Sequence, residues 1–309
     1  MLRAKRLAYT RLATTDIARD TDYWSRIVGL AIVDRTADRV VLATRLGQEC
    51  VVLEKGARDG VLNGLAFQLD PGVGLGDVER ALWSHGIAVS RRADPTPCAR
   101  EALAFEDPRG ATIEVFTDTS FAADDGLDCG VQPQKFGHMA FTTRDPQKIT
   151  QFYCDVLGFR VSDWIGSRFS FLRCGPNHHT INFAHGPTEG IHHIAFEMRD
   201  RADLLEACDT LARREVQLVW GPSRHVVGHN MAAYHQNPSD LRIELFTELD
   251  QMSDESLGYF DPRPWHEERP LRPKTWPEDT WRSQWGFGSF GSFPGYPERP
   301  VTDRAGNRL

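Results

Sequence analysis

Residues 136–145, Phe-Gly-His-Met-Ala-Phe-Thr-Thr-Arg-Asp, have a close counterpart at residues 7–16, Leu-Ala-Tyr-Thr-Arg-Leu-Ala-Thr-Thr-Asp. In both stretches a largely apolar run, typical of a strand, ends in an aspartate that begins a helical pattern. The helical patterns end at Gly29 and Gly158, so the two copies are offset by 158 − 29 = 129 residues. This spacing indicates that the chain contains a duplicated structural unit.

The duplication extends through both halves of the chain. Residues 64–69 match residues 193–198 at the same offset, 193 − 64 = 129. Residues 107–116 match residues 237–246 at an offset of 244 − 114 = 130. Because the offset changes by only one residue, a single gap separates the compared stretches. We therefore expect two halves with the same fold.

Each half divides into two units, and each unit has the order strand, helix and three strands. The four βαβββ units are expected at about residues 1–55, 60–117, 134–187 and 190–247. The patterns predict helices at residues 16–27, 75–85, 202–214 and after Asp145-Pro146, and strands that include residues 39–44, 49–53, 168–173 and 180–184. The predicted fold is α+β, with the units paired into two barrel-like domains.

The composition is that of an ordinary soluble globular protein, with 40% hydrophobic and 26% charged residues among 309. A net charge of −7 argues against nucleic-acid binding, which normally requires a basic face. The N-terminus lacks the apolar core of a signal peptide, and no apolar run approaches the roughly 20 residues of a membrane helix. The six cysteines form no Cys-x-x-Cys pair and are expected to be reduced, so the sequence predicts a cytoplasmic protein without membrane partners.

Nine of the eleven histidines lie between residues 136 and 246. His138 and His193 occupy corresponding strand positions in the two units of the second half, and Glu244 interrupts an apolar strand, where an unpaired carboxylate is costly. Two imidazoles and one carboxylate with open coordination positions are typical of non-haem Fe(II) sites. At the matching positions the first half has Tyr9, Gly64 and Glu114, so it keeps the carboxylate but neither imidazole. We therefore expect a metal only in the second half.

Three regions follow from these patterns: an N-terminal domain without metal (residues 1–120), a metal-binding domain (134–248) and a C-terminal extension (249–309). The extension is rich in proline and glycine, which excludes long regular elements. It also contains four tryptophans, Trp265, Trp276, Trp281 and Trp285. Disordered segments contain few aromatic residues, so we expect the extension to pack on the surface. It would either cover the mouth of the site or brace the outside of the domain.

Several short motifs share their spacing with one enzyme family. These motifs are Gly137-His138, Asn177-His178-His179-Thr180, His192-His193, Arg224-His225, Tyr234, Pro238 and Glu244. With them the chain resembles the type I extradiol catechol dioxygenases of the vicinal oxygen chelate superfamily over about residues 5–248. The extension matches this family only loosely.

The resemblance implies that His138, His193 and Glu244 bind Fe(II), and such ligands also suit Mn(II). The choice of His193 over its neighbour His192 follows the family pattern and the alternation of side chains along a strand, which points only one of the two inward. His192 would then lie at the surface or behind the site. The sequence leaves the role of His229 open.

The resemblance also assigns three catalytic residues. His179 would act as the acid and base on substrate protons, and His225 and Tyr234 would hydrogen-bond the substrate oxygens. His179 is chosen over His178 for the same two reasons as His193, so His178, like His192, would lie at the surface or behind the site. The expected substrates are a catechol and O2, and the ring would open beside the two hydroxyl groups. Two remaining histidines, His185 and His235, are expected to be solvated.

Two other functions fit parts of this pattern. A glyoxalase-like isomerase of the same superfamily would bind a metal, but such enzymes commonly use a fourth protein ligand and lack the set of His179, His225 and Tyr234. A non-enzymatic ligand-binding protein on this fold would not require the three metal ligands. We also expect a homo-oligomer, because an N-terminal copy without chemistry is a natural interface.

Overall fold

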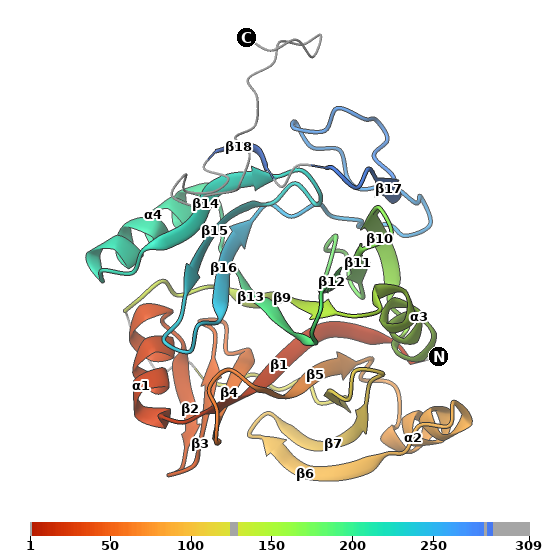
Figure 1. Cartoon of the computed structure of the whole chain (residues 1–309). Helices are drawn as coiled ribbons and strands as arrows, with labels where there is room; N and C mark the ends of the chain where they lie inside the picture. Colours follow the sequence, from red (N-terminus) through yellow and green to blue (C-terminus); the bar gives the residue numbers. More distant parts are fainter. Residues whose placement is uncertain (1, 124–128, 281–282, 287–309) are drawn as a thin grey trace.

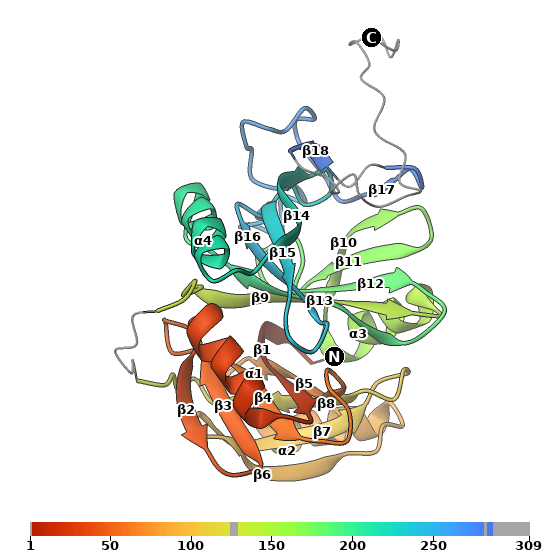
Figure 2. The same ribbon diagram turned by 60° about the vertical axis from the view of Figure 1, so that its left-hand side comes forward.

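The computed structural model describes residues 2–123, 129–280 and 283–286, and these form two mixed sheets, one for each half of the chain. Figures 1 and 2 both place the sheets one above the other, with β9 (Lys135–Thr143) of the second half beside β1 (Ala4–Thr14) of the first. The largest cluster of buried apolar residues contains side chains of both halves, and three smaller clusters lie apart from it. The second sheet curves into a half-barrel.

The first sheet has the strand order β2-β3-β4-β1-β5-β8-β7-β6. Its other strands are β2 (Ala31–Arg35), β3 (Arg39–Ala43), β4 (Glu49–Lys55), β5 (Leu62–Leu69), β6 (Ser90–Thr96), β7 (Ala99–Glu106) and β8 (Thr112–Phe116). The second sheet has the order β17-β10-β11-β12-β9-β13-β16-β15-β14-β18. Its other strands are β10 (Arg160–Ile165), β11 (Phe169–Arg173), β12 (Ile181–His185), β13 (Gly190–Glu197), β14 (Leu218–His225), β15 (Met231–Gln236), β16 (Arg242–Thr247), β17 (Lys274–Trp276) and β18 (Ser283–Gly286).

These elements confirm the predicted α+β fold of four βαβββ units. In each half the first strands of the two units pair antiparallel at the centre of the sheet, β1 with β5 and β9 with β13. Each of these strands also pairs in parallel with the last strand of its own unit; β1 joins β4 and β13 joins β16. The central strands are buried, so side chains on their concave face meet inside the half-barrel.

Aspartate side chains begin three of the four α-helices in the described part of the chain, α1 (Ile17–Asp22), α3 (Pro146–Leu157) and α4 (Arg201–Arg213). The carboxylates of Asp16, Asp145 and Asp200 each accept a hydrogen bond from a backbone N–H of the first turn, which satisfies a donor that has no partner within the helix. The remaining helix is α2 (Leu75–Ser84). No helix in the described part of the chain is long and apolar enough to span a membrane.

The predicted helix at residues 16–27 is interrupted. After α1 the chain continues as a wider π-helical turn, η1 (Tyr23–Ile27). The turn buries Tyr23, Trp24 and Ser25, and the Trp24 ring lies 5.9 Å from the ring of Phe196 in the other half. The wider turn therefore presents two aromatic side chains to the interface between the sheets.

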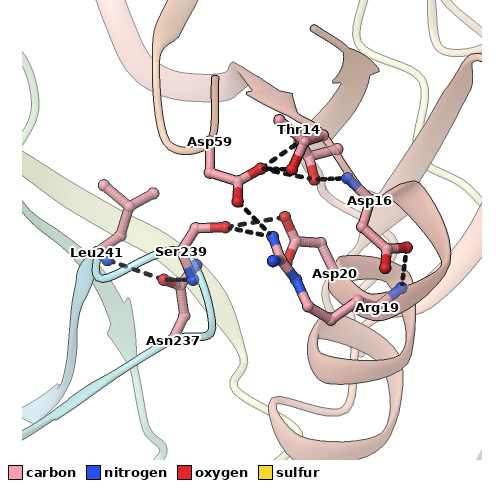
Figure 3. Close-up of polar contacts among 9 residues, drawn as sticks. Thr14, Asp16, Arg19, Asp20, Asp59, Asn237, Ser239 and Leu241 are labelled. Atoms are coloured by element: carbon pink, nitrogen blue, oxygen red, sulfur yellow. Dashed lines mark hydrogen bonds and ion pairs between the residues drawn. The ribbon is translucent and has the colours of Figure 1, made fainter. Parts of the chain in front are cut away.

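Polar contacts join α1 to the second half (Figure 3). The turn between β15 and β16 is held by the Asn237 side chain, whose oxygen accepts hydrogen bonds from the N–H groups of Ser239 and Leu241. The Ser239 hydroxyl lies 3.1 Å from Nη2 of Arg19 and donates to Asp20 at 3.0 Å. The first helix of one half thus holds the turn that leads into β16, a strand of the predicted site.

His235 is a second link between the halves. We expected it to be solvated, but this prediction is wrong: its side chain is fully buried. Its Nε2 forms a 2.6 Å hydrogen bond with the hydroxyl of Tyr23 on η1. Burial lowers the pKa of His235 to about 3. The side chain lies on the face of β15 that meets the other half of the chain, a contact that the sequence pattern does not reveal.

The C-terminal extension adds a strand to each edge of the half-barrel. β17 pairs with β10 and β18 pairs with β14, so the extension connects the two edges. Only six residues separate β17 from β18, and a chain of that length spans at most about 25 Å. Trp265 and Trp276 are half-buried, Trp285 is 49% exposed, and Trp281 lies outside the described residues. These contacts support a bracing role, and a covering role stays a prediction.

The burial of His235 predicts a pH-dependent stability. Its pKa is about 3 in the folded protein and about 6.5 in an unfolded chain, so only the unfolded chain binds its proton between these values. This residue should therefore destabilise the fold by about 1.4 kcal/mol per pH unit as the pH falls from about 6.5 toward 3. Urea unfolding at pH 7.5 and 5.5 should show a weaker pH dependence for His235→Leu than for wild type.

Tyr23→Phe is the matched control, because it removes the hydrogen bond and leaves the imidazole buried. We expect it to lose about 1–3 kcal/mol at both pH values while keeping the pH dependence of wild type. An unchanged pH dependence in His235→Leu would contradict this account.

Candidate metal centre

Successive strands of the half-barrel carry the predicted site residues. His138 lies on β9, His193 on β13 and Glu244 on β16, which are neighbours in that order. The strand register places Ala195 of β13 opposite both His138 and Glu244. Because β9 and β16 flank β13 and both residues lie beside Ala195, the side chains of His138 and Glu244 come close together. The fold assembles these three residues from segments that are up to 106 positions apart.

The three side chains meet at one buried point. Nε2 of His138 and Nε2 of His193 lie 3.0 and 3.1 Å from the same oxygen, Oε2 of Glu244, and 3.1 Å from each other. The exposed fractions of these residues are between 1% and 5%. Three bonds of about 2.1 Å that meet at right angles end about 3.0 Å apart, so the triangle fits one face of an octahedral metal ion.

The protonation of these groups also suits a metal ion. Burial lowers the pKa of His193 to about 4. Burial opposes the ionisation of Glu244, but its contacts with His138 and His193 outweigh this effect and keep its pKa well below the ordinary value. Metal ligands must be deprotonated, and these pKa shifts leave a carboxylate and a lone pair on His193 at neutral pH.

A further polar side chain orients the carboxylate. Asn230 donates a 2.9 Å hydrogen bond from Nδ2 to Oε1 of Glu244, which leaves Oε2 directed at the two histidines. Such a partner fixes the orientation of a ligand and tunes its basicity. The sequence did not point to Asn230, because no spacing relates it to Glu244 and it lies just before β15, outside the strand pattern.

The three predicted catalytic residues surround this triangle. The rings of His179 and His138 are 4.3 Å apart, and the rings of Tyr234 and His193 are 5.5 Å apart. Nε2 of His225 lies 3.0 Å from the Tyr234 hydroxyl and 4.0 Å from Oε1 of Glu244. Groups able to donate or accept protons therefore lie on two sides of the same point. The Trp220 ring, which the sequence analysis did not single out, stacks on His225 with centroids 4.6 Å apart.

The two pairs of adjacent histidines are arranged differently. His192 is half-buried, and His193 points inward as predicted. His178, in contrast, is as buried as His179, at 1% and 3% exposed. These two residues precede β12 and are not part of a strand, so the expected alternation of inward and outward side chains does not apply. His185 is exposed as predicted.

The N-terminal half neutralises its matching carboxylate with arginines. Glu114 accepts a 2.6 Å hydrogen bond from the Tyr9 hydroxyl and contacts Arg92 at 2.7 Å and Arg11 at 3.0 Å. A Cβ on Gly64, which matches His193, would lie 2.7 Å from Nε of Arg11. A guanidinium thus occupies the space that an imidazole fills in the second half, and this leaves no place for a metal ion beside Glu114.

A second buried group, which we call the Asp250 cluster, contains Asp250, His229 and His266. Here each histidine contacts a different carboxylate oxygen: Nδ1 of His229 lies 2.6 Å from Oδ2, and Nε2 of His266 lies 2.7 Å from Oδ1. Two N–H groups that each donate to one oxygen satisfy the cluster without a cation. At the triangle, in contrast, three electron-pair donors share one point. We therefore expect the Asp250 cluster to anchor His266 of the extension.

The metal assignment predicts one metal ion per chain. His193→Ala removes one of three ligands and should lose the metal, whereas Glu114→Gln, the control in the N-terminal half, should keep it. Metal analysis of the purified proteins measures both. Near-stoichiometric metal in His193→Ala, or two ions per chain in wild type, would contradict the assignment.

Comparisons with known proteins agree with this geometry. The family model for the Glyoxalase/Bleomycin resistance protein/Dioxygenase superfamily matches residues 135–245. The chain is 27% identical to the iron-dependent extradiol dioxygenase of Rhodococcus jostii (strain RHA1), over 81% of this chain and 91% of that protein. It is 26% identical to the biphenyl-2,3-diol 1,2-dioxygenase of Paraburkholderia xenovorans (strain LB400), over 77% of this chain and 86% of that protein.

The fold is also similar to solved structures. The Mn(II)-bound glyoxalase from Novosphingobium aromaticivorans matches with a TM-score of 0.80 and 24% identity, and the match covers 96% of both chains. At this identity the match supports the fold and not the activity. The matched family model places residues 135–245, which contain the His-His-Glu triangle, in the glyoxalase/bleomycin resistance protein/dioxygenase superfamily, and the matched sequences make the chain as a whole similar to extradiol dioxygenases.

Proposed function

We propose that this chain catalyses extradiol cleavage of a catechol by O2, with the site residues assigned as follows. The observation that carries the proposal is the triangle of His138, His193 and Glu244 with proton-handling side chains beside it. Two histidines and one carboxylate leave coordination positions open for two oxygens of a catechol and for O2. The relatives named above as an extradiol dioxygenase and a biphenyl-diol dioxygenase support the same substrate class.

A metal bound here would acidify the catechol hydroxyl groups and bring the ring and O2 together. We propose Fe(II), as in the iron-dependent relative, although the same ligands suit Mn(II), the ion in the similar glyoxalase structure. Imidazole and carboxylate ligands do not by themselves select between the two ions. Reconstitution of metal-free protein with each ion, followed by activity assays, separates them.

The surrounding side chains handle protons. His179 would accept a hydroxyl proton from the catechol and return it to oxygen during cleavage, since its buried imidazole has a pKa well below the ordinary value and starts neutral. That shift arises from burial first and from the neighbouring His138 and His178 next. On the other side, Tyr234 and His225 would hydrogen-bond the substrate oxygens as charge develops on them.

The reaction balances as addition of O2 to the substrate. One carbon–carbon bond of the ring breaks beside the two hydroxyl groups. One oxygen atom enters a carboxylate and the other enters an aldehyde or ketone, so the product is an opened chain of the muconic semialdehyde type. Because the site is buried, water has little access to the reacting atoms.

Oxygen uptake tests this function. Anaerobically Fe(II)-loaded protein should consume one O2 per catechol and form a coloured ring-opened product. A panel of single-ring and biaryl catechols should then identify the preferred substrate. Stoichiometric iron with no oxygen uptake on any catechol would favour a binding protein or an isomerase over the dioxygenase. Assembly into a homo-oligomer stays a prediction from the sequence.

The assignment of His179 predicts a variant that separates metal binding from chemistry. His179→Gln should keep its iron and bind catechol, while turnover falls about 10²–10⁴-fold, the usual contribution of a positioned acid or base. Iron analysis, catechol titration under anaerobic conditions and oxygen uptake measure the three quantities. A variant that loses iron would instead identify His179 as a metal ligand.

A further inference from the structure

A line of buried polar side chains leads away from the metal centre behind His179. Nδ1 of His179 lies 2.9 Å from Nδ1 of His178, and Nε2 of His178 lies 3.1 Å from Oδ2 of Asp163 on β10. Both Asp163 and His178 are buried. Gly228 gives this contact its room, since a Cβ there would lie 3.2 Å from Nδ1 of His178.

The C-terminal extension holds the far end of this line. β17 pairs with β10 so that Lys274 lies opposite Asp163. The backbone N–H of Lys274 donates to Oδ1 of Asp163 at 2.8 Å, and the indole N–H of Trp276 donates to Oδ2 at 2.7 Å. A buried carboxylate is costly unless its oxygens accept hydrogen bonds, and here the extension supplies two of the donors.

The N-terminal half provides an internal comparison. Asp34 on β2 matches Asp163 at the offset of the duplication, 163 − 34 = 129. Its side chain is 41% exposed and lies 3.8 Å from Arg39. An aspartate at this strand position is therefore common to both copies, whereas its burial against a histidine occurs only in the copy with the metal ligands.

With both imidazoles neutral, the contacts leave one arrangement of the protons. A neutral imidazole has one N–H donor and one acceptor nitrogen, and a carboxylate only accepts. Nε2 of His178 must therefore donate to Asp163, which leaves Nδ1 of His178 as an acceptor. Nδ1 of His179 must then donate to it, so the lone pair of His179 lies on Nε2. That nitrogen is the one the proposed reaction requires for a substrate proton.

We propose that Asp163 and His178 are positioning residues that fix the tautomer and orientation of His179, and that Lys274 and Trp276 of the extension hold Asp163 in place. The inference rests on the proposed function for the use made of the His179 lone pair. The tautomer itself exists without substrate and can be measured independently. The extension thereby contributes to the site at a distance from the reacting atoms.

The tautomer is tested by NMR on ¹⁵N-histidine-labelled protein loaded with diamagnetic Zn(II), with His179→Gln used to assign the signals. We expect the His179 proton on Nδ1 in wild type and distributed over both ring nitrogens in Asp163→Leu. Oδ2 of Asp163 accepts from both His178 and Trp276, so a leucine, which has no acceptor, leaves Nε2 of His178 without the partner that fixes its proton. A proton on Nε2 of His179 in wild type, or an unchanged tautomer in Asp163→Leu, would overturn the proposal.

Kinetics test the consequence. Asp163→Leu should lose about 10²–10⁴-fold in kcat, as expected for a misplaced acid or base, while its iron content and KM stay near the wild-type values. Asp34→Leu, the matched control, should behave as wild type in every measurement. Loss of iron, or an unchanged kcat, in Asp163→Leu would contradict the proposal. If Asp163 only stabilised the pairing of β17 with β10, the variant would melt at a lower temperature and its kcat would be unchanged.

A second pair of variants covers the case in which Asp163→Leu does not fold. His178→Asn keeps an amide oxygen that can accept from Nδ1 of His179, whereas His178→Leu removes the acceptor. We expect His178→Asn to retain most of the kcat that His178→Leu loses. Equal losses in these two variants would contradict the proposal. If wild type cleaves no catechol, the NMR result still decides this inference, so its failure is distinguishable from failure of the proposed function.

Discussion

The convergence of three electron-pair donors on one buried point is the constraint on which the rest of this half depends. His138, His193 and Glu244 present two lone pairs and a carboxylate within 3.1 Å of each other, an arrangement that hydrogen bonds alone satisfy poorly. A divalent cation satisfies all three together, and metal binding is then coupled to folding. The buried strands around the triangle and Asn230 behind Glu244 keep these ligands in place for one ion.

In the N-terminal half, arginine side chains instead of a metal ion compensate the charge of the buried carboxylate. Glu114 occupies the position of Glu244, but two arginines and the Tyr9 hydroxyl surround it. The guanidinium of Arg11 fills the space beside Gly64 that a histidine would need. The N-terminal copy therefore keeps the fold and the buried carboxylate while giving up the metal. Its first helix meanwhile holds the turn before β16, so it supports the strand that bears Glu244 (Figure 3).

The duplication explains why the sequence predicted so much of this structure. Matching positions in two copies identified the four units, and the contrast between His138 or His193 and their counterparts pointed to the triangle. Contacts between distant segments carried no such signal. The burial of His235 depends on Tyr23, more than 200 residues away, and the burial of His178 depends on Asp163 and on an extension without a counterpart. Alternation along a strand also fails where the chain leaves the strand, as it does at His178.

The central claim is that one metal ion lies at the triangle and none beside Glu114 or at the Asp250 cluster. Crystals of Fe(II)-loaded protein, measured at the iron absorption edge, test it most directly. The account predicts a single anomalous peak per chain at bonding distance from Nε2 of His138, Nε2 of His193 and Oε2 of Glu244. A peak beside Glu114 or at the Asp250 cluster, or no peak at the triangle in iron-loaded crystals, would contradict it.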